Sequence, residues 1–454
     1  MKFLAVFFSS LILALVLTPV AERVAYRLRV IDIPDGRKRH RVPIPLLGGL
    51  AIYLSFFITT GAFMFCTAQW TGAEQRIFLG LFVASTLVFL GGIVDDIRGL
   101  DAPQKFSIQI AAAVILVLFG YPQDVLLRLI PGLPRTEMLE YLGIAFFIFW
   151  MVMLTNAMNL IDGLDGLAAG VAFVASYFLL LTAIALKRPL MVPLSLALCG
   201  ATLGFLRYNF HPARIFMGDA GSMLLGFLLG AISFQGLAKR ITLFTLLIPI
   251  LLLAIPIFDT TLAFLRRLLS GKNPFVADRD HFHHKMIRLG LTQAQAVTIV
   301  YLVCAVFGIL SLSLVRFGSQ VIIVVFLVVS LLVFAGLYVL GYFRPGERPE
   351  FEFVEKRTLP RTFKELIVEY ECRGMKSRAL SLDISLGGIF LRTQTPLEVG
   401  AHLTLRFLDP ATEKPVERYG TVVWNTTECP KRHEVSGMGI MFTAQPAARP
   451  EAPA

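Results

Sequence analysis

Long apolar runs separated by short polar segments occupy most of the chain up to residue 341. A helix that crosses a bilayer needs roughly 17–25 predominantly apolar residues. Runs of this kind predict eleven membrane-spanning helices, near residues 3–21, 47–68, 77–94, 106–121, 141–158, 167–186, 190–208, 221–238, 242–265, 294–315 and 320–341. The pattern therefore predicts a polytopic α-helical membrane protein. In the Gly-rich run around 221–236, a tilted or broken helix is an alternative.

The first apolar run also has features of a secretory signal peptide, because Lys2 precedes it. No convincing small-residue cleavage site follows this run, and many further apolar runs do. We therefore expect an uncleaved first helix.

The pattern of the chain changes after Tyr342. Residues 342–350 are polar and Pro-rich and predict a linker between the membrane domain, 1–341, and a second domain. From 351 onward the apolar positions recur with period two, which predicts short strands near 366–370, 379–382, 402–407, 420–424 and 438–442. A region of this size and pattern predicts a small all-β domain over 351–444, a barrel or a sandwich, and we favour the β-barrel. The Ala/Pro-rich residues 445–454 predict a disordered tail.

Composition supports the membrane assignment and narrows the classes of partner. Of the 454 residues, 56% are hydrophobic and 16% are charged, which excludes an ordinary soluble domain. The net charge of +11 could indicate nucleic acid binding. In a membrane protein, however, Lys and Arg collect in cytoplasmic loops and bind anionic lipids or phosphate-bearing substrates. We adopt the second interpretation and expect no nucleic-acid partner.

The five cysteines show neither CxxC nor metal-ligand spacing, so we do not expect a disulfide framework. Three of them, Cys66, Cys199 and Cys304, lie in apolar runs and are expected to be small buried hydrophobic residues.

Clusters of polar residues follow the first, third, fifth, seventh and ninth apolar runs. Because successive spans alternate in direction, all five clusters are expected on one side of the membrane. Two of these loops are rich in basic residues, at 37–39 and 266–267, which indicates the cytoplasmic side. With eleven spans, the C-terminal domain is also expected in the cytoplasm.

The cluster after the fifth run carries the strongest signal. It places Asn156, Asn159, Asp162 and Asp165 at the mouth of an apolar segment. A polar group without a partner costs several kcal/mol in such surroundings, and intramembrane carboxylates usually mark functional sites. The cluster therefore predicts a ligand site, the alternative being that these residues only cap a helix end.

Two further clusters bring carboxylates. Asp95 and Asp96 follow an apolar helix, with Lys105 shortly after, and paired carboxylates can hold Mg²⁺ or orient a phosphate. The segment 207–222 contains Asp219 at the expected start of a helix, where free N–H groups and the helix dipole suit a phosphate. Taken alone, Asp219 could be an N-cap. We expect Gly218 and Gly221 to allow close backbone approach.

The last two clusters are basic. The segment 277–284 carries Arg279, His281, His283 and His284, which suit donation to diphosphate and sugar oxygens. Their spacing fits neither the helical i, i+4 pair nor the Cys/His knuckle of zinc sites. The segment 32–49 carries Lys38 and His40, and its arginines are interpreted as positive-inside anchors.

These five motifs, in this order across residues 32–290, resemble those of the polyprenyl-phosphate N-acetylhexosamine-1-phosphate transferase family. The histidine segment is similar to that of the WecA-type branch and differs from the MraY branch. The resemblance implies transfer of a HexNAc-1-phosphate from UDP-HexNAc to undecaprenyl phosphate with release of UMP. It also implies a bacterial inner membrane and a cytoplasmic active site, since nucleotide sugars are cytoplasmic.

The resemblance implies a role for each cluster. Mg²⁺, with Mn²⁺ as an alternative, is expected on Asp219 and Asp95, and Lys105 is expected to meet the lipid phosphate. Asp165 is expected to contact uracil, Lys38 and His40 to face the nucleotide, and Asn159 or Asp162 to lie near the metal and the sugar. The expected catalytic residues are Asp95, Asp96, Asp162 and Asp219, and the further substrate-binding residues are Asn156, Arg279, His281, His283 and His284.

The proposed nucleophile limits what the carboxylates need to do. A phosphomonoester has a second pKa near 6, so at pH 7 it is already largely ionised. A strong general base is therefore not obligatory, and the carboxylates are more plausible as metal ligands and positioning groups.

A second resemblance covers about 351–444. Arg357 and Arg361, followed by Asp383, Ser385 and Gly388, resemble the RxxxR and D-x-S-x-x-G signature of PilZ domains, which implies binding of cyclic di-GMP. Two arginines on a linker can clamp phosphates and stack on guanine planes. The other three residues are expected to form a turn that accepts the guanine edge.

Alternatives remain open from the sequence. A phospho-MurNAc-pentapeptide transferase and a catalytically inactive membrane receptor for cyclic di-GMP fit most of the motifs. A transporter with midplane carboxylates is disfavoured, because the motifs line one face and no inverted repeat is apparent. The identity of the HexNAc, the glycan pathway and the oligomeric state, with a homodimer as one option, are not readable from the sequence.

Overall fold

The computed structural model of the chain describes residues 2–32, 43–67, 70–121, 136–236, 250–269, 286–287, 290–317, 321, 324–325, 327–331, 366–372, 375–385, 388–408, 415–425 and 437–443. For 262–269, 382–385, 424, 443 and 236 the backbone alone is described. The chain divides into two compact units, Met1–Arg348 and Pro349–Ala454, and each is described by itself.

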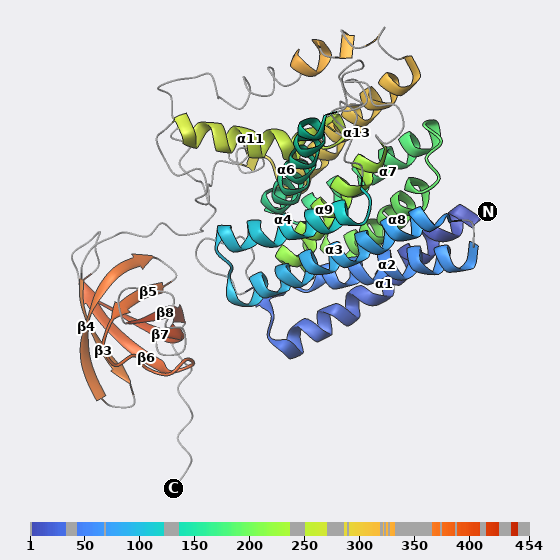
Figure 1. Ribbon diagram of the computed structural model, residues 1–454. Helices are drawn as coiled ribbons and strands as arrows, with labels where there is room; N and C mark the ends of the chain where they lie inside the picture. Colours follow the sequence, from blue (N-terminus) through green and yellow to red (C-terminus); the bar gives the residue numbers. More distant parts are fainter. Residues whose placement is uncertain are drawn as a thin grey trace. The chain divides into compact units, whose positions relative to one another are not determined.

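The first unit is built from helices (Figure 1). Their bounds are α1 Lys2–Leu28, α2 Gly48–Thr67, α3 Gly72–Arg98, α4 Ala102–Leu118, α6 Glu137–Ile161, α7 Leu167–Ala185, α8 Met191–Asn209, α9 Gly218–Gly236, α11 Ala254–Leu269 and α13 Gln293–Phe317. Among the described residues, seven helices are long and apolar enough to cross a membrane: α1, α2, α3, α6, α7, α8 and α13. The predicted polytopic helical fold is confirmed. Residues 242–249 and most of the predicted last span lie outside the described part.

Helix α9 lies at the centre of this unit. It packs against α2, α3, α6, α7 and α8, and every residue from 221 to 235 is buried. Glycines allow this dense packing, since a Cβ on Gly226 would lie 2.4 Å from the Leu154 carbonyl oxygen of α6. The helix continues unbroken to Gly236, so the Gly-rich composition reflects close helix packing, and the broken-helix alternative is wrong.

The glycines near the start of α9 also serve helix packing. A Cβ on Gly92 of α3 would lie 2.3 Å from the Cα of Ala220, and one on Gly49 of α2 would lie 2.5 Å from the Cα of Gly221. Gly218 has φ of +71°, a conformation that glycine adopts without strain. At Gly221 the close approach that we expected is made by α2, whereas a Cβ on Gly218 would meet the Asp96 carboxylate and the Leu46 carbonyl.

Helix α1 packs on α8 and α2, and α8 in turn packs on α7. The Ser10 hydroxyl donates to the Ala197 carbonyl of α8 at 2.6 Å, and the Tyr208 hydroxyl donates to the Leu15 carbonyl at 3.1 Å. The first helix is thus packed into the bundle along its length.

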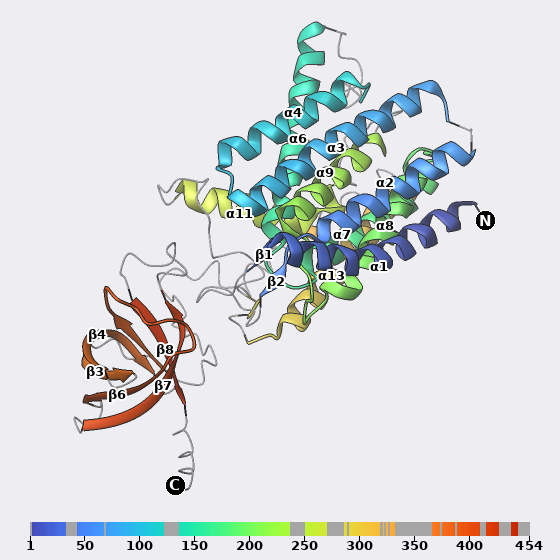
Figure 2. The same cartoon turned by 90° about the horizontal axis from the view of Figure 1, so that it is seen from below.

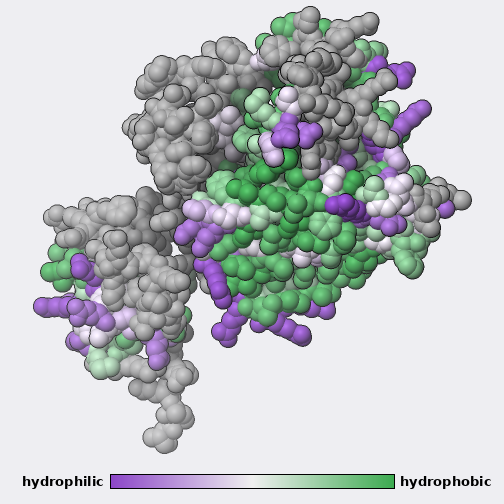
Figure 3. All heavy atoms as spheres, in the orientation of Figure 1, coloured by the Kyte–Doolittle hydropathy of each residue, from purple (hydrophilic) through white to green (hydrophobic). Residues whose placement is uncertain are grey.

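The described residues on the face of the helical unit seen in Figure 3 are largely apolar. Large exposed side chains such as Phe8, Ile12 and Val16 follow one face of α1, as expected for a helix facing lipid. Cys199 and Cys304 are buried as predicted, whereas Cys66 is exposed. The prediction for Cys66 was wrong because an apolar run in a membrane helix has a face turned away from the protein.

The second unit is a closed six-stranded antiparallel barrel. Its strands are β3 Leu366–Cys372, β4 Met375–Ser385, β5 Gly388–Arg392, β6 His402–Leu408, β7 Pro415–Asn425 and β8 Gly437–Thr443, in the order β3-β4-β5-β8-β7-β6. The core alternates along the strands, with Val368, Leu391 and Leu405 fully buried. The predicted β-barrel is confirmed.

The sequence interpretation missed β5 and misplaced the end of β4. Asp383 pairs with Phe390 and Ser385 pairs with Gly388, so both residues lie in a strand, whereas we expected a turn. Apolar and polar residues continue to alternate in the sequence up to Ser385, beyond the strand end that we predicted at residue 382. Residues 386–387 lie outside the described part.

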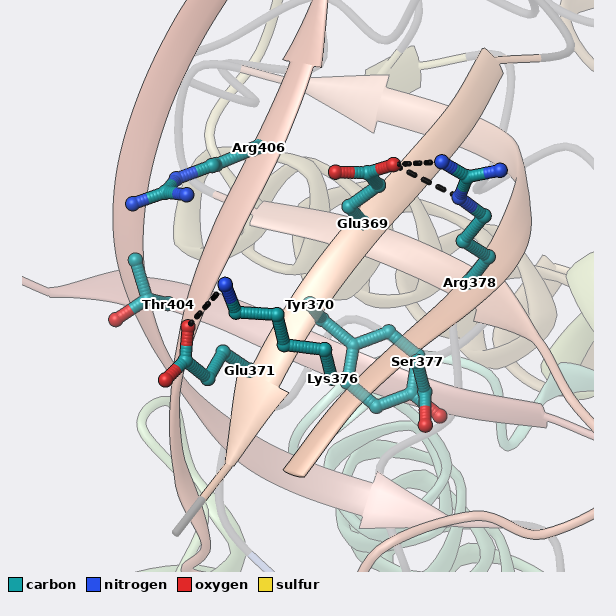
Figure 4. A pocket seen from close by; sticks show the side chains of 8 residues that line it. All are labelled: Glu369, Tyr370, Glu371, Lys376, Ser377, Arg378, Thr404 and Arg406. Atoms are coloured by element: carbon teal, nitrogen blue, oxygen red, sulfur yellow. Dashed lines mark hydrogen bonds and ion pairs between the residues drawn. The ribbon is translucent and has the colours of Figure 1, made fainter. Parts of the chain in front are cut away.

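The outer face of the barrel between β3, β4 and β6 carries charged side chains around a shallow hollow (Figure 4). Arg378 lies 2.5 Å from Glu369, and Lys376 lies 4.0 Å from Glu371. These pairs are largely exposed and contribute little to stability. They neutralise one another, and we assign no ligand to this face.

Candidate active site

Four helix ends meet at one end of the helical unit. The last turn of α3 and the first turn of α4 bring Asp95, Asp96 and Lys105, while the last turns of α6 bring Asn159. The first turn of α9 brings Asp219. Figure 2 shows α3, α4, α6 and α9 side by side, in agreement with their packing contacts. The structure thus brings together polar residues from three of the predicted clusters.

Lys105 lies between two carboxylates. Its ammonium forms an ion pair with Asp95 and lies 3.0 Å from Oδ2 of Asp219. The Lys105 and Asp95 side chains are 23% and 3% exposed, and that of Asp219 is 37% exposed. The pair of carboxylates therefore already holds one positive charge, and Asp219 is the member that remains open to a substrate.

Asp96 is engaged with the backbone of α9. The N–H groups of Asp219 and Ala220 donate to its two carboxylate oxygens at 2.7 and 3.1 Å. A carboxylate in this position caps the helix and interacts favourably with its dipole. The N–H groups that we expected to hold a phosphate are therefore occupied by Asp96 in this structure.

Asn159 holds the Asp219 side chain in place. Its amide donates to Oδ1 of Asp219 at 2.8 Å and to the hydroxyl of Ser222 at 2.9 Å. With Lys105 on the other oxygen, both oxygens of Asp219 are oriented by neighbouring helices.

Asn156 has a different environment one helical turn earlier. It donates to Oε1 of Gln109 at 2.6 Å, and Gln109 donates back at 3.4 Å. Gln109 is 1% exposed. This pair of amides joins α4 to α6, and the binding of substrate by Asn156 stays a prediction.

Asp162 follows α6 and lies among other acidic groups. Burial, followed by the negative charges of nearby aspartates, raises the pKa of Asp162 to about 8. The aspartates concerned are Asp219, Asp96 and Asp165. A carboxyl group with a raised pKa keeps its proton to a higher pH than a free carboxyl group, and a nearby cation would favour its ionised form.

Asp165 is held by the loop between α8 and α9. Its Oδ2 accepts from the Ala213 N–H at 3.1 Å and lies 2.8 Å from Nδ1 of His211. His211 is 45% exposed and Asp165 is 16% exposed. The other oxygen of Asp165 has no hydrogen bond among the described residues, so it is available to a ligand.

The turn after Asp165 is fixed from two sides. Asn209 accepts from the Gly166 N–H at 3.1 Å, and the Tyr301 hydroxyl of α13 donates to the Gly166 carbonyl at 2.5 Å. Gly166 has φ of +79°, which favours glycine at this position. The acidic segment 162–165 therefore sits on a rigid base.

The first polar loop is anchored beside these residues. Strands β1 (Ile31–Asp32) and β2 (Ile44–Pro45) pair at its base, and the N–H of Phe216 donates to the Pro45 carbonyl at 2.8 Å. Lys38 and His40 themselves lie outside the described residues, as do Arg279, His281, His283, His284, Arg357 and Arg361. For Asp383 and Ser385 only the backbone is described.

Sequence interpretation missed His211 and Gln109. His211 lies inside the segment 207–222 that was singled out, but its link to Asp165 depends on the fold. Gln109 is a polar residue within a predicted span, and this was a signal that could have found it.

Two of the described carboxylates could hold a divalent cation such as Mg²⁺. Within the described residues, no group of three or more His, Cys, Asp or Glu side chains is placed to hold a metal ion. Mg²⁺ commonly binds through one or two carboxylates and completes its shell with water and substrate phosphates. Asp219 and Asp95 could hold such an ion, because both already contact the ammonium group of Lys105.

Comparison with known proteins assigns both units to families. Residues 78–237 match glycosyl transferase family 4, and residues 355–449 match the PilZ domain. The chain is 37% identical over 313 residues to a probable undecaprenyl-phosphate N-acetylglucosaminyl 1-phosphate transferase of Bacillus subtilis, covering 69% of this chain and 85% of the relative. The chain belongs to glycosyl transferase family 4.

Other relatives in this family carry similar names. A decaprenyl-phosphate N-acetylglucosaminephosphotransferase of Mycolicibacterium smegmatis is 36% identical over 61% of this chain and 73% of the relative. An undecaprenyl-phosphate alpha-N-acetylglucosaminyl 1-phosphate transferase of Escherichia coli is 31% identical over 63% of this chain and 76% of the relative. The family 4 match includes Asp95, Lys105, Asn159 and Asp219.

Proposed function

We propose that the helical unit transfers a HexNAc-1-phosphate from a UDP-sugar to undecaprenyl phosphate and releases UMP. The observation that carries this proposal is the Asp95–Lys105–Asp219 cluster at the meeting point of four helices. Two anionic reactants need positive charge between them. This cluster supplies one cation, the Lys105 ammonium, and two carboxylates that can bind a second cation.

In the proposed reaction, an oxygen of the lipid phosphate attacks the β-phosphorus of the UDP-sugar. A new P–O bond forms, the bond from the β-phosphorus to the bridging oxygen breaks, and UMP leaves with that oxygen. The lipid phosphate is largely ionised at pH 7, so no residue needs to remove its proton. Lys105 binds this phosphate, and its position next to the exposed face of Asp219 supports that role.

The remaining residues bind and position the reactants. Asp219 and Asp95 would hold Mg²⁺, which would neutralise charge on the diphosphate when bound. Asn159 fixes the orientation of Asp219, and Asp96 fixes the start of α9 beneath it. Asp165, oriented by His211, accepts from the uracil ring through its second oxygen.

We propose GlcNAc as the sugar on the basis of the relatives' names. We also propose that the site faces the cytoplasm of a bacterial inner membrane, where UDP-sugars are found. Two of the loops on this side are basic, at 37–39 and 266–267, as is typical of cytoplasmic loops.

The reaction is tested with purified full-length protein, UDP-[¹⁴C]GlcNAc, undecaprenyl phosphate and Mg²⁺. We expect label in butanol-extractable lipid and UMP in equal amount, and added UMP should reverse the reaction, since one phosphoanhydride replaces another. Release of UDP would indicate glycosyl transfer and refute the proposal. Parallel assays with other UDP-HexNAc donors test the sugar.

For the barrel, we propose cyclic di-GMP as ligand, supported by the PilZ match and by the arginine pair Arg357 and Arg361. The barrel forms a compact unit with its own core, so residues 351–444 can be tested as an isolated domain. Calorimetry is expected to show binding, and no heat at 100 μM ligand would refute it. An effect on transferase rate requires two enzyme states that bind the ligand differently. We favour activation.

A further inference from the structure

An apolar groove lies at the other end of the helical bundle from the proposed active site. It has a volume of about 590 Å³ and lies between α1, α7 and α8 and the turn that joins α7 to α8. Its lining is apolar except at the turn, where Lys187 and Arg188 contribute. The apolar lining consists of Phe3, Leu4, Leu180, Ala183, Ile184, Pro189, Val192 and Leu196.

The groove lies near a membrane boundary. Helix α7 starts directly after the Asp165 segment, and its 19 residues rise by roughly 28 Å along the helix axis. This length is close to the roughly 30 Å thickness of the hydrocarbon core. The turn that follows α7 therefore lies at headgroup level on the side opposite the active site. Figure 2 likewise shows the N-terminus and the β1–β2 hairpin at opposite ends of α1.

The groove is open to the bilayer. Phe3, Leu4 and Ile184 are 47%, 60% and 57% exposed, while Ala183 and Leu196 form a buried base. Apolar side chains in this arrangement suit an acyl chain that lies along the protein.

The cationic end of the groove is the C-terminal cap of α7. Lys187 has φ of +52°, in the left-handed region that Gly or Asn adopts more readily. The Arg188 N–H donates to the Ala183 carbonyl at 2.8 Å, which closes the turn beneath it. The Lys187 N–H also donates to the Ile184 carbonyl at 3.2 Å, so this helix cap fixes the backbone of both basic residues.

We infer that this groove binds an anionic phospholipid, with an acyl chain on the apolar lining and the headgroup phosphate on Lys187 and Arg188. Basic pockets between membrane helices recognise such headgroups. Charge complementarity selects an anionic over a zwitterionic lipid, and the apolar groove selects a lipid over a free phosphate.

The inference is tested by native mass spectrometry of the full-length protein in detergent, titrated with dioleoyl-phosphatidylglycerol or dioleoyl-phosphatidylcholine. Wild type is expected to bind the anionic lipid at least about fivefold more tightly. The double variant Lys187→Ala/Arg188→Ala should lose that preference. Because Arg188 is partly buried, Lys187→Ala alone provides a variant at an exposed position, expected to lose at least half of the preference.

A second variant separates the groove from simple surface charge. Val192→Trp fills the apolar part and leaves both basic residues, so it should also weaken binding of the anionic lipid at least about fivefold. Arg316→Ala, at an exposed basic position near the end of α13, is the matched control and should bind as wild type. Thermal denaturation of each variant establishes that it is folded.

Three outcomes would overturn the inference. Equal binding of the two lipids by wild type would show that the basic residues do not recognise the charge of the headgroup. Wild-type binding by Val192→Trp would show that only surface charge attracts the lipid. Displacement of phosphatidylglycerol by equimolar undecaprenyl phosphate would show that the groove takes the substrate lipid instead.

Discussion

Replacing Asp96 with asparagine tests whether this residue positions the site or takes part in the chemistry. Both carboxylate oxygens accept backbone N–H groups at the start of α9, at 2.7 and 3.1 Å. Asparagine keeps the shape of the side chain but offers one accepting oxygen and places an NH₂ group against the second N–H. One hydrogen bond to a charged group is lost, which costs about 1.5–3 kcal/mol.

This loss sets the scale of the expected effect. If all of it appears in the barrier, the rate falls by roughly 10- to 150-fold, since 1.36 kcal/mol corresponds to tenfold. We expect kcat/KM to fall within this range and the apparent Mg²⁺ affinity to weaken with it, because Asp219 begins the helix that Asp96 caps. The assay is radiolabelled sugar-phosphate transfer at several Mg²⁺ concentrations, with thermal denaturation measured in parallel.

A matched control is Asp101→Asn, which changes an exposed aspartate at the start of α4, away from Asp219. It should keep activity within about twofold, since asparagine is also a good N-cap. Asp96→Asn with activity within about twofold of wild type would show that the two N–H bonds do not matter for the site. A loss beyond about 10⁴-fold with unchanged Mg²⁺ affinity and stability would show that Asp96 acts directly on the reactants.

Four further predictions follow from the site and the barrel. Asp219→Asn should reduce transfer by orders of magnitude in a folded protein, and a rate within about threefold of wild type, about 0.7 kcal/mol, would contradict its role as a metal ligand. Apparent Mg²⁺ affinity measured by calorimetry should rise as the pH is raised toward about 8, because Asp162, with its pKa raised to about 8, then loses its proton and attracts the cation. Asp162→Asn should flatten this dependence of Mg²⁺ affinity on pH. An identical pH dependence in the variant would refute the assignment. His211→Ala should raise KM for the UDP-sugar roughly tenfold with little change in kcat, because the hydrogen bond to the Asp165 carboxylate is lost. His211→Asn should restore part of the affinity. An unchanged KM would show that the His211–Asp165 pair does not orient the nucleotide. Arg361→Ala in the isolated barrel should weaken cyclic di-GMP binding at least about tenfold in calorimetry, and equal affinity would exclude this arginine as a main contact.

The apolar pattern predicted most of the membrane fold because lipid imposes length and composition on each span. The helix ends were harder to predict. Helix α3 continues to Arg98 and α6 to Ile161, beyond the predicted ends at 94 and 158, because polar residues in the last turns find partners on other helices. Their pairing is a tertiary effect that hydropathy does not contain.

Motif spacing singled out Asp95, Lys105, Asn159 and Asp219, which the structure brings together, but it could not show which partner each residue has. Asp95 and Asp96 are adjacent in sequence and of the same type. One pairs with Lys105, and the other caps α9. Neighbouring residues on a helix point in different directions, so their partners depend on which helices pack on each face.

In the barrel, alternation gave five of the six strands. Strand β5 was missed because Gly388–Arg392 is short and follows β4 after two residues, so the two strands read as one strand and a turn. Asp383 also follows a register shift after Ser381, which period-two reasoning cannot anticipate.

The meeting of four helices at Asp219 has a consequence for biogenesis. During synthesis, α3 and α4 leave the ribosome about a hundred residues before α9, so Asp96 and Lys105 are inserted before their partners on α9 are made. Asp95 and Lys105 can neutralise each other within the α3–α4 hairpin, but Asp96 has to wait for the N–H groups of α9. The hairpin therefore completes its hydrogen bonds only when the central helix inserts.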